Sequence, residues 1–222
     1  MIHEHLFSAI LSALHNVSGI KLSGESIIQK VLFDKIMSNN YFFNIEDEST
    51  YVTFIQSLHN SLSDFINKHV EYKIQEVELC KTHYSFCLKR YGNPEIFLDI
   101  TLSDDIMGKR ITFDNNTYNI VPSNEEILAD TLINIFIYNN KLEEYLIYFC
   151  NSYKSYNLNG VFEVLDYKYP GITKEHFKNI PQFDKQKYSQ CLTELVLNDV
   201  EYNLENTIIN FNNFYNEIIS EL

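Results

Sequence analysis

The sequence has no tryptophan and little glycine, proline or cysteine: six glycines, four prolines and four cysteines among 222 residues. Hydrophobic residues still make up 45% of the chain, which excludes a disordered protein and predicts a globular one. Phenylalanine and tyrosine number 16 each. Together with the many Asn, Ile and Lys residues, they indicate an AT-rich coding sequence as much as a functional need for aromatic side chains.

The cysteines lack the spacing of a structural zinc site, because no pair follows a CxxC or CxxH pattern. Cys87, Cys150 and Cys191 lie in or beside apolar runs, as reduced core cysteines of cytosolic proteins do. The N-terminus lacks the basic region of a signal peptide. No apolar run approaches the roughly 20 residues of a membrane span. We therefore expect a cytoplasmic protein without a membrane partner.

Basic residues are also scarce, at 17 against 30 acidic ones, and the formal net charge is −13. A uniformly acidic surface repels phosphate backbones, so generic nucleic-acid binding is not expected. The same charge attracts basic proteins and speeds their association. A basic protein partner is therefore one open interpretation of the composition.

The chain changes character near Pro122. Residues 1–121 mix helical and strand patterns, whereas residues 122–222 show helical periodicity throughout. A chain of this length can form two small domains. We expect an α+β domain over 1–121 and a helical bundle domain over 122–222.

The hydrophobic spacing predicts the elements of both halves. In the first half we expect helices at 2–17 and 49–69, a helix that Ser26 caps, and strands at 41–45, 72–79, 82–90 and 95–102. A change of phase within 72–79 predicts a β-bulge. Residues 103–121 are expected to form a loop with a short strand near 118–121. In the second half the capping box Ser123–Glu126 opens a helix, and further helical segments are expected at 142–153, 157–167, 173–179, 184–197 and 203–219.

The run IFLDITL, residues 96–102, is the most informative stretch of the first half. Its even-numbered residues are all aliphatic, and its odd-numbered positions place an aspartate, Asp99, near the middle of a strand. The turn signal Gly92-Asn93-Pro94 predicts a hairpin with the preceding strand. An ionised carboxylate at such a position is costly to bury unless it is paired, hydrogen-bonded or bound to a metal. Asp99 is thus the first candidate functional residue.

Two other acidic groups and one small-residue turn accompany Asp99. Glu46-Asp47-Glu48 follows the strand at 41–45, and Asp104-Asp105 follows the strand that contains Asp99. Carboxylates on adjacent strands can hold Mg²⁺, which also takes water and substrate phosphates as ligands. The turn Ser23-Gly24 precedes a helix, whose N-terminal N–H groups can bind a phosphate.

The order of these pieces resembles the AbiEii-like nucleotidyltransferase family of abortive-infection and toxin–antitoxin proteins. IKLSGES is similar to that family's first strand and glycine-rich turn, and IFLDITL is similar to its third-carboxylate strand. YNIVPSNEEILADTL resembles the extended segment and helix that follow there. The resemblance covers most of the chain. It implies a nucleotidyltransferase-like mixed sheet with flanking helices, followed by an all-helical C-terminal domain.

The chain departs from the family at several motif positions. The turn has Ser23-Gly24 where the family has two glycines, and the paired Asp-x-Asp falls at Asn44-Ile45-Glu46. Thr131 stands where the family has a lysine. The later Arg-Asp motif corresponds at best to residues 141–144. With one metal carboxylate replaced by an amide, two-metal nucleotidyl transfer would be impaired.

Two hypotheses follow from the sequence. In the first, which the resemblance implies, the chain is a divergent nucleotidyltransferase-fold protein of a bacterial defence or toxin–antitoxin type. It transfers a nucleotide from an NTP with Mg²⁺ or retains only the fold. Asp99 and Glu46 would then be the catalytic metal carboxylates, and Ser23 and Gly24 would hold the triphosphate. In the second, the chain is a non-enzymatic acidic binding module, such as an immunity protein or antitoxin that neutralises a basic toxin.

Overall fold

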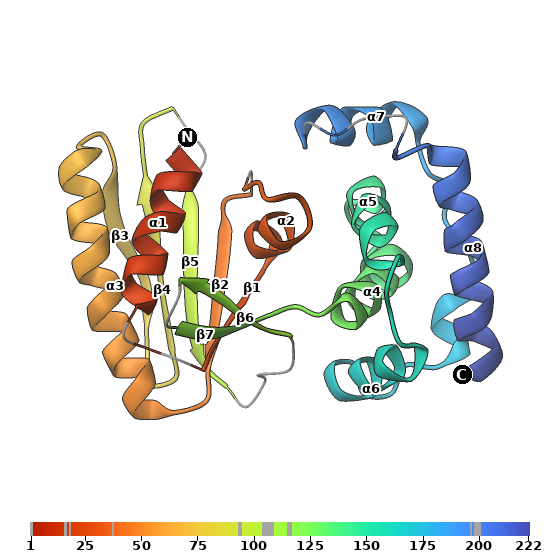
Figure 1. Ribbon diagram of the computed structural model, residues 1–222, viewed down its shortest axis with the longest axis horizontal. Helices are drawn as coiled ribbons and strands as arrows, with labels where there is room; N and C mark the ends of the chain where they lie inside the picture. Colours follow the sequence, from red (N-terminus) through yellow and green to blue (C-terminus); the bar gives the residue numbers. More distant parts are fainter. Residues whose placement is uncertain are drawn as a thin grey trace. The chain divides into compact units, whose positions relative to one another are not determined.

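The structure, a computed structural model, places the chain in two compact units, Met1–Pro122 and Ser123–Leu222. The division falls one residue after the boundary expected from the sequence. The structure describes residues 2–15, 17, 19–36, 38–92, 95–103, 109–114, 117–195, 197 and 201–222. The first unit is a mixed α/β structure and the second is helical (Figure 1).

The first unit contains three helices and one mixed sheet within the residues that the structure describes. The helices are α1 (Ile2–Leu14), α2 (Glu25–Phe33) and α3 (Glu48–Lys68). The strands are β1 (Ile20–Ser23), β2 (Asn40–Ile45), β3 (Lys73–Leu79), β4 (His83–Lys89), β5 (Ile96–Leu102), β6 (Lys109–Asp114) and β7 (Thr117–Val121). They form one sheet in the order β3-β4-β5-β2-β1-β7-β6.

The sheet is antiparallel except at two places. β2 lies parallel to β5, and β1 lies parallel to β7. The parallel pairing of β2 with β5 brings two segments together that are about fifty residues apart in the sequence. As a result the C-terminal end of β1 lies beside the N-terminal part of β2, which in turn pairs with β5, near the middle of the sheet.

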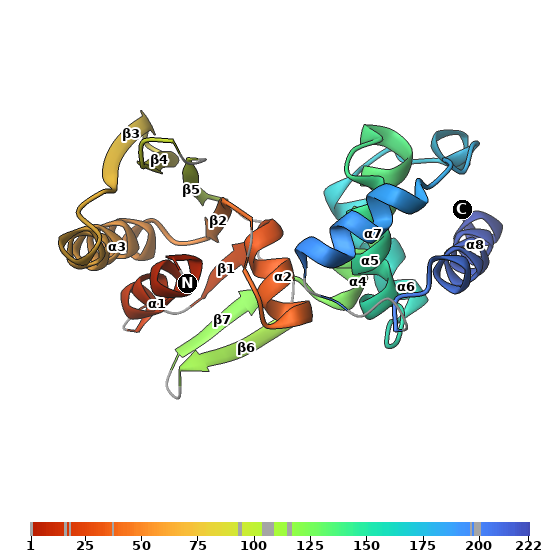
Figure 2. The same ribbon diagram turned by 90° about the horizontal axis from the view of Figure 1, so that it is seen from above.

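Helices cover both faces of this sheet. Figure 2 shows α1 and α3 on one face and α2 on the other, over β1 and β2. The ring of Phe43 contacts that of Phe54 on α3, with centroids 5.1 Å apart, which identifies the first face. Phe42, the next residue along β2, faces α2 instead, because successive side chains of a strand point to opposite faces.

The hydrophobic core lies between the sheet and the α1–α3 face. In β2 the odd-numbered residues Tyr41, Phe43 and Ile45 are fully buried. The even-numbered residues of β5 fill the same layer, as the alternation in IFLDITL predicts. Ridge residues of α1 and α3 complete the core, among them Leu6, Ile10, Phe54, Leu58 and Leu62. The opposite face is therefore free to carry polar side chains.

Most expected elements of the first unit are confirmed, including the hairpin of β4 and β5 and the bulge in β3, which lies between Glu76 and Glu78. Asn93 and Pro94 of the predicted hairpin turn lie outside the described residues. Two predictions are wrong. Ser26 does not cap α2: Gly24 is the N-cap, while Ser26 is buried in the first turn and donates to the Ser38 carbonyl. The segment 103–121 contains a second strand, β6, that the sequence did not predict.

The second unit is built from helices, as predicted. They are α4 (Asn124–Ile133), which continues into a π-helical turn η1 (Asn134–Tyr138), α5 (Leu142–Ser152), α6 (Leu158–Lys168), the 3₁₀ turn η2 (Lys174–Phe177), α7 (Lys185–Glu194) and α8 (Leu204–Glu221). Ser123 caps α4 by accepting from the Glu126 N–H at 3.2 Å. An aromatic cluster forms its core, with Phe149 against Phe211 and Phe214.

Candidate functional site

Two polar rows cross the α2 face of the sheet. The strand registers place Ser23 (β1) opposite Phe42 (β2), Phe42 opposite Asp99 (β5), and Asp99 opposite Ser85 (β4). This first row contains the last residue of β1 and the mid-strand aspartate. It joins the predicted phosphate turn to the predicted metal ligand through one intervening residue, Phe42.

The second row lies two residues further along β2. It contains Lys21, Asn44, Thr101 and His83, paired in that order across β1, β2, β5 and β4. Lys21 is the buried residue of this row. Asn44 is diagonal to Asp99, at the next position of the same face.

Asp99 is half-buried and has polar neighbours. Its side chain is 24% exposed, and its Oδ1 lies 3.6 Å from the Nε2 of His83. The other ring nitrogen of His83, Nδ1, lies 3.2 Å from the Thr101 hydroxyl. Glu78 on β3 is 3.9 Å from His83 Nε2. His83 therefore lies between two carboxylates, and the Thr101 hydroxyl fixes the position of its ring.

The electrostatics of this cluster favour a proton or a cation at Asp99. Burial raises the pKa of the Asp99 carboxyl above its ordinary value. His83 opposes this rise, the charge of Glu78 adds to it, and a hydrogen bond with Ser85 opposes it again. The net pKa is raised, so the ionised form is destabilised by its surroundings. A bound cation would relieve this cost.

The Ser23-Gly24 turn begins α2 at the end of the first row. Gly24 has φ 85°, in the left-handed region that glycine adopts without strain. Its carbonyl accepts from the N–H groups of Ile27 and Ile28, and no side chain caps the helix. The first-turn N–H groups thus face the same end of the sheet as Ser23. This is the arrangement that binds anions at helix N-termini.

Phe42 closes the space beside this turn. A Cβ atom added to Gly24 would lie 2.5 Å from Cδ2 of the Phe42 ring. Phe42 as a whole remains 39% exposed. A glycine is therefore required at position 24 both for its backbone conformation and for the close approach of an aromatic side chain.

The other predicted carboxylates are placed differently. Glu46 is exposed and lies just beyond the last residue of β2. It is four residues past Phe42, the partner of Asp99, which corresponds to about 13 Å along the strand. The register thus brings Asn44, not Glu46, next to Asp99. Asp104 and Asp105 lie outside the described residues.

Three residues of this site were not assigned to it from the sequence. His83 could be paired with a Ser or Cys in space, but its spacing in the sequence does not show a partner, and Ser85 is only part of a strand. The predicted hairpin, once its register is fixed, sets them opposite Thr101 and Asp99. Lys21 gave a weaker signal, as a lone lysine in an apolar strand. Such a lysine indicates either a strand edge or a buried charge with a partner.

The cluster does not form a complete metal site from protein ligands. Among the residues that the structure describes, no three His, Cys, Asp or Glu side chains are grouped to hold a metal ion. Magnesium sites often use one or two carboxylates and take their other ligands from phosphates and water. The α2 face offers one such carboxylate, Asp99, so a magnesium ion there would need phosphates and water for its other ligands.

Comparisons with known proteins supply no family for the chain. No protein-family model and no curated protein sequence matches it. Among solved structures, the crystal structure of JHP933 from Helicobacter pylori is similar to 99% of this chain and 91% of that chain, with 13% identity and a TM-score of 0.46. No helix in the described part of the chain is long and apolar enough to cross a membrane.

Proposed function

We propose that this protein is a divergent nucleotidyltransferase-fold protein that binds an NTP with Mg²⁺ on the α2 face of its sheet. The observation that supports this most is the first polar row. It aligns Ser23, at the start of α2, with Asp99 on a strand that is parallel to β2. The proposal implies a cytoplasmic location, where NTP and Mg²⁺ are supplied.

The dimensions of the row suit a triphosphate with its metal ion. Adjacent strands are about 4.8 Å apart, so Ser23 and Asp99, two strands apart, are separated by about 10 Å across the sheet. In the proposed complex the N–H groups after Gly24 bind phosphate oxygens. Asp99 binds Mg²⁺, which bridges to the same phosphates. Lys21 adds a positive charge on this face.

The residues support nucleotide binding more strongly than nucleotide transfer. Transfer through two metal ions needs carboxylates that hold both ions close together. The polar residue of β2 diagonal to Asp99 is the amide Asn44, and the next carboxylate along the chain, Glu46, lies just beyond the end of β2. Asn44 can donate a carbonyl oxygen to Mg²⁺ but cannot supply a negative charge. We therefore propose Asp99 as the main metal ligand and Glu46 as the residue on which any transfer depends.

Isothermal titration calorimetry with ATP, GTP, CTP and UTP tests this proposal. We expect the wild-type protein to bind at least one NTP only when Mg²⁺ is present, and Asp99→Ala to lose that binding. Asp64→Ala is the matched control, because Asp64 is an exposed aspartate on α3, which covers the other face. Absence of NTP binding in the wild-type protein, or equal binding in Asp99→Ala, would overturn the proposal.

Glu46→Ala separates binding from transfer. If Glu46 acts only in transfer, the variant keeps Mg²⁺-dependent NTP binding and loses incorporation of a labelled nucleotide into an acceptor. Loss of binding itself would show that Glu46 is needed to hold the metal, despite the four-residue offset from Asp99.

The net charge of −13 favours a second candidate function, that of an acidic module that binds a basic protein. Such association would be fast and strongly salt-dependent. Cross-linking in the native host, followed by identification of the captured protein, tests it. Recovery of no basic partner, with the bait protein present at normal levels, would contradict this candidate.

A further inference from the structure

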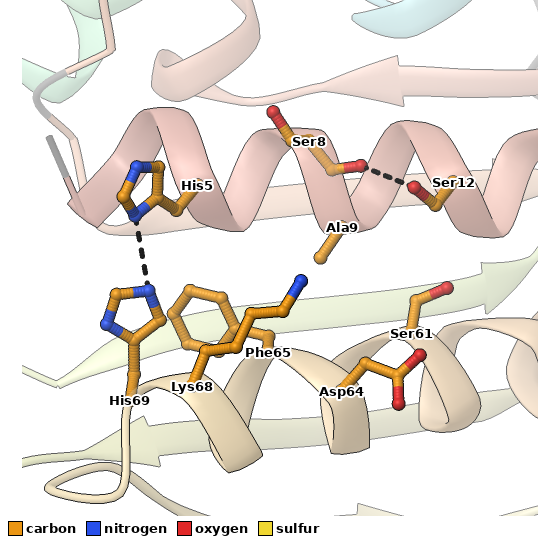
Figure 3. A pocket seen from close by; sticks show the side chains of 9 residues that line it. All are labelled: His5, Ser8, Ala9, Ser12, Ser61, Asp64, Phe65, Lys68 and His69. Carbon is orange, nitrogen blue, oxygen red and sulfur yellow. Dashed lines mark hydrogen bonds between the residues drawn. The ribbon is translucent and has the colours of Figure 1, made fainter.

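A groove runs between α1 and α3 on the outer side of the first unit, away from the Asp99 face (Figure 3). Its volume is about 490 Å³. Small and polar side chains line much of it, and the residues used below are His5 on α1 and His69, which caps the C-terminus of α3. One aspartate, Asp64, and one lysine, Lys68, also line the groove, so its charged side chains offset each other.

The two histidines meet at one end of the groove. The Nδ1 of His5 lies 3.2 Å from the Nε2 of His69, and the ring centroids are 5.2 Å apart. Two imidazoles bound to one tetrahedral Zn²⁺, with Zn–N distances of about 2.0–2.1 Å, have nitrogens about 3.3 Å apart and centroids about 5.2 Å apart. The observed separations agree with that geometry without movement of either helix.

A carboxylate lies near the second ring nitrogen of His69. Glu71 Oε1 lies 4.0 Å from the Nδ1 of His69, and it also lies 3.9 Å from Arg90. At 4.0 Å the carboxylate is a charged neighbour of Nδ1 and not its hydrogen-bond partner. The other ring nitrogen, Nε2, is the one that faces His5. The ring of Phe65, with its centroid 4.6 Å from that of His69, limits the orientation of His69.

We propose that His5 and His69 bind a Zn²⁺ ion at the end of the α1–α3 groove, with Glu71 as a nearby negative charge. Imidazole nitrogens select zinc and related transition metals over Mg²⁺. No third protein ligand is grouped with them among the described residues, so water or a ligand in the groove fills the other positions. Without metal, one ring donates an N–H to the other, and binding displaces that proton.

This site is independent of the proposed nucleotide site. It lies on the opposite side of the sheet and uses nitrogen rather than oxygen ligands. The ion would join the N-terminal helix to the end of α3. Zinc is therefore expected to raise the thermal stability of the first unit as well as to bind.

The test uses the full-length chain without an affinity tag, since tag histidines bind the same metals. Zn²⁺ is titrated by calorimetry and Co²⁺ by absorption spectroscopy into wild type, His5→Gln, His69→Gln and Glu71→Gln. His15→Gln, which changes an exposed histidine directly after α1, is the matched control. We expect one saturable site in wild type and in His15→Gln, and its loss in both His5→Gln and His69→Gln. Glu71→Gln, which removes only a neighbouring charge, should weaken binding by less than about tenfold.

His5 is exposed, so His5→Gln is expected to remain folded, which circular dichroism checks. The Co²⁺ spectrum should show nitrogen and oxygen ligands and no thiolate charge-transfer band, which excludes binding through the exposed Cys80. Absence of binding in the wild type would overturn the proposal. Equal binding in wild type and folded His5→Gln would do the same.

Discussion

At the scale of single residues, the proposed nucleotide site depends most on Asp99. The sequence identified it as a mid-strand carboxylate that needs a partner. The structure supplies His83, Ser85 and the more distant Glu78. None of these neighbours outweighs the effect of burial, because the pKa of Asp99 remains raised. An ionised aspartate kept at such a position costs stability, and such costs are concentrated at functional sites.

We therefore predict that Asp99→Asn stabilises the first unit at pH 7, by about 1 kcal/mol. A raised pKa means that the folded protein holds the Asp99 proton more tightly than the unfolded chain does. The ionised form present at pH 7 thus favours unfolding, and the amide removes that effect. Below the ordinary carboxyl pKa of 3.8 both forms are neutral and the difference disappears. Urea denaturation at pH 7 and at pH 3 measures this, and a destabilised Asp99→Asn at pH 7 would contradict it.

In the second unit, Lys168 is a largely buried charged residue with a raised pKa, as Asp99 is in the first, but its role is structural. Its Nζ lies 2.8 Å from Asp130 and 3.1 Å from Glu126, whose side chain is only 2% exposed. Burial alone would lower the pKa of Lys168, but the two carboxylates outweigh it and raise the pKa. Tyr169 adds a 2.6 Å hydrogen bond to Asp130. This cluster joins α4 to α6.

Lys168→Met should destabilise the second unit by about 3 kcal/mol, because it leaves two carboxylates close together without the ammonium group between them. Lys154→Met is the control, since the Lys154–Glu201 pair is exposed at both ends and such pairs contribute less than about 1 kcal/mol. Urea denaturation followed by circular dichroism distinguishes the two variants. Equal losses of stability would show that the buried cluster has no special importance.

At the scale of elements, the β1–α2 connection determines whether the first polar row exists. Gly24 allows the chain to turn directly from β1 into α2, and Phe42 packs against it. The sequence predicted the turn but assigned the cap to Ser26, since serine is a common N-cap. The glycine conformation needed at position 24 moved the start of the helix back by two residues. Ser26 instead donates to the Ser38 carbonyl.

Gly24→Ala should destabilise the first unit by about 2 kcal/mol or more, from the left-handed φ together with the clash with Phe42. Gly19→Ala provides the control. Gly19 also has a positive φ, 80°, but no atom lies within 4 Å of an added Cβ. The difference between the two variants in urea denaturation isolates the clash. A double variant, Gly24→Ala with Phe42→Ala, should recover that difference, and a Gly24→Ala loss no larger than that of Gly19→Ala would contradict the expected contact.

The elements that were predicted correctly have strong local signals. The alternation in IFLDITL, the helical spacing of α3 and the Ser123 cap all depend on neighbours within one segment. The pairing of β2 with β5 does not, because it joins strands separated by α3 and a hairpin. The placement of Glu46 follows from that long-range register, and so the sequence could not show that Asn44 is the closer residue to Asp99. The strand β6 has a mixed polar composition, KRITFD, without a clear period.

At the scale of the whole molecule, the chain carries an excess of 13 negative charges, which belongs to the surface as a whole and not to one contact. Self-repulsion of this kind destabilises the folded state at low ionic strength. It also disfavours nucleic acid as a partner. If an NTP binds as proposed above, Mg²⁺ would be needed to offset the negative charge of both partners.

We predict that KCl stabilises the protein between low and physiological ionic strength, with Tm rising by about 2–4 °C. The salt screens repulsion among the excess acidic groups more than it weakens individual ion pairs such as Lys89–Glu95. Thermal denaturation in a KCl series measures this, with sorbitol at matched osmolarity as the control. A Tm that falls or stays constant with KCl would show that the acidic groups are already balanced locally.

The most direct test of the proposed nucleotide site is nuclear magnetic resonance with Mn²⁺ in place of Mg²⁺. A paramagnetic ion carried by a bound NTP broadens the backbone signals closest to it. We expect the signals of Ser23, Gly24, Asn44 and Asp99 to broaden first, and only when NTP and Mn²⁺ are both present. Broadening centred on other acidic segments, or on His5 and His69, with Asp99 unaffected, would contradict a nucleotide site on the α2 face of the sheet.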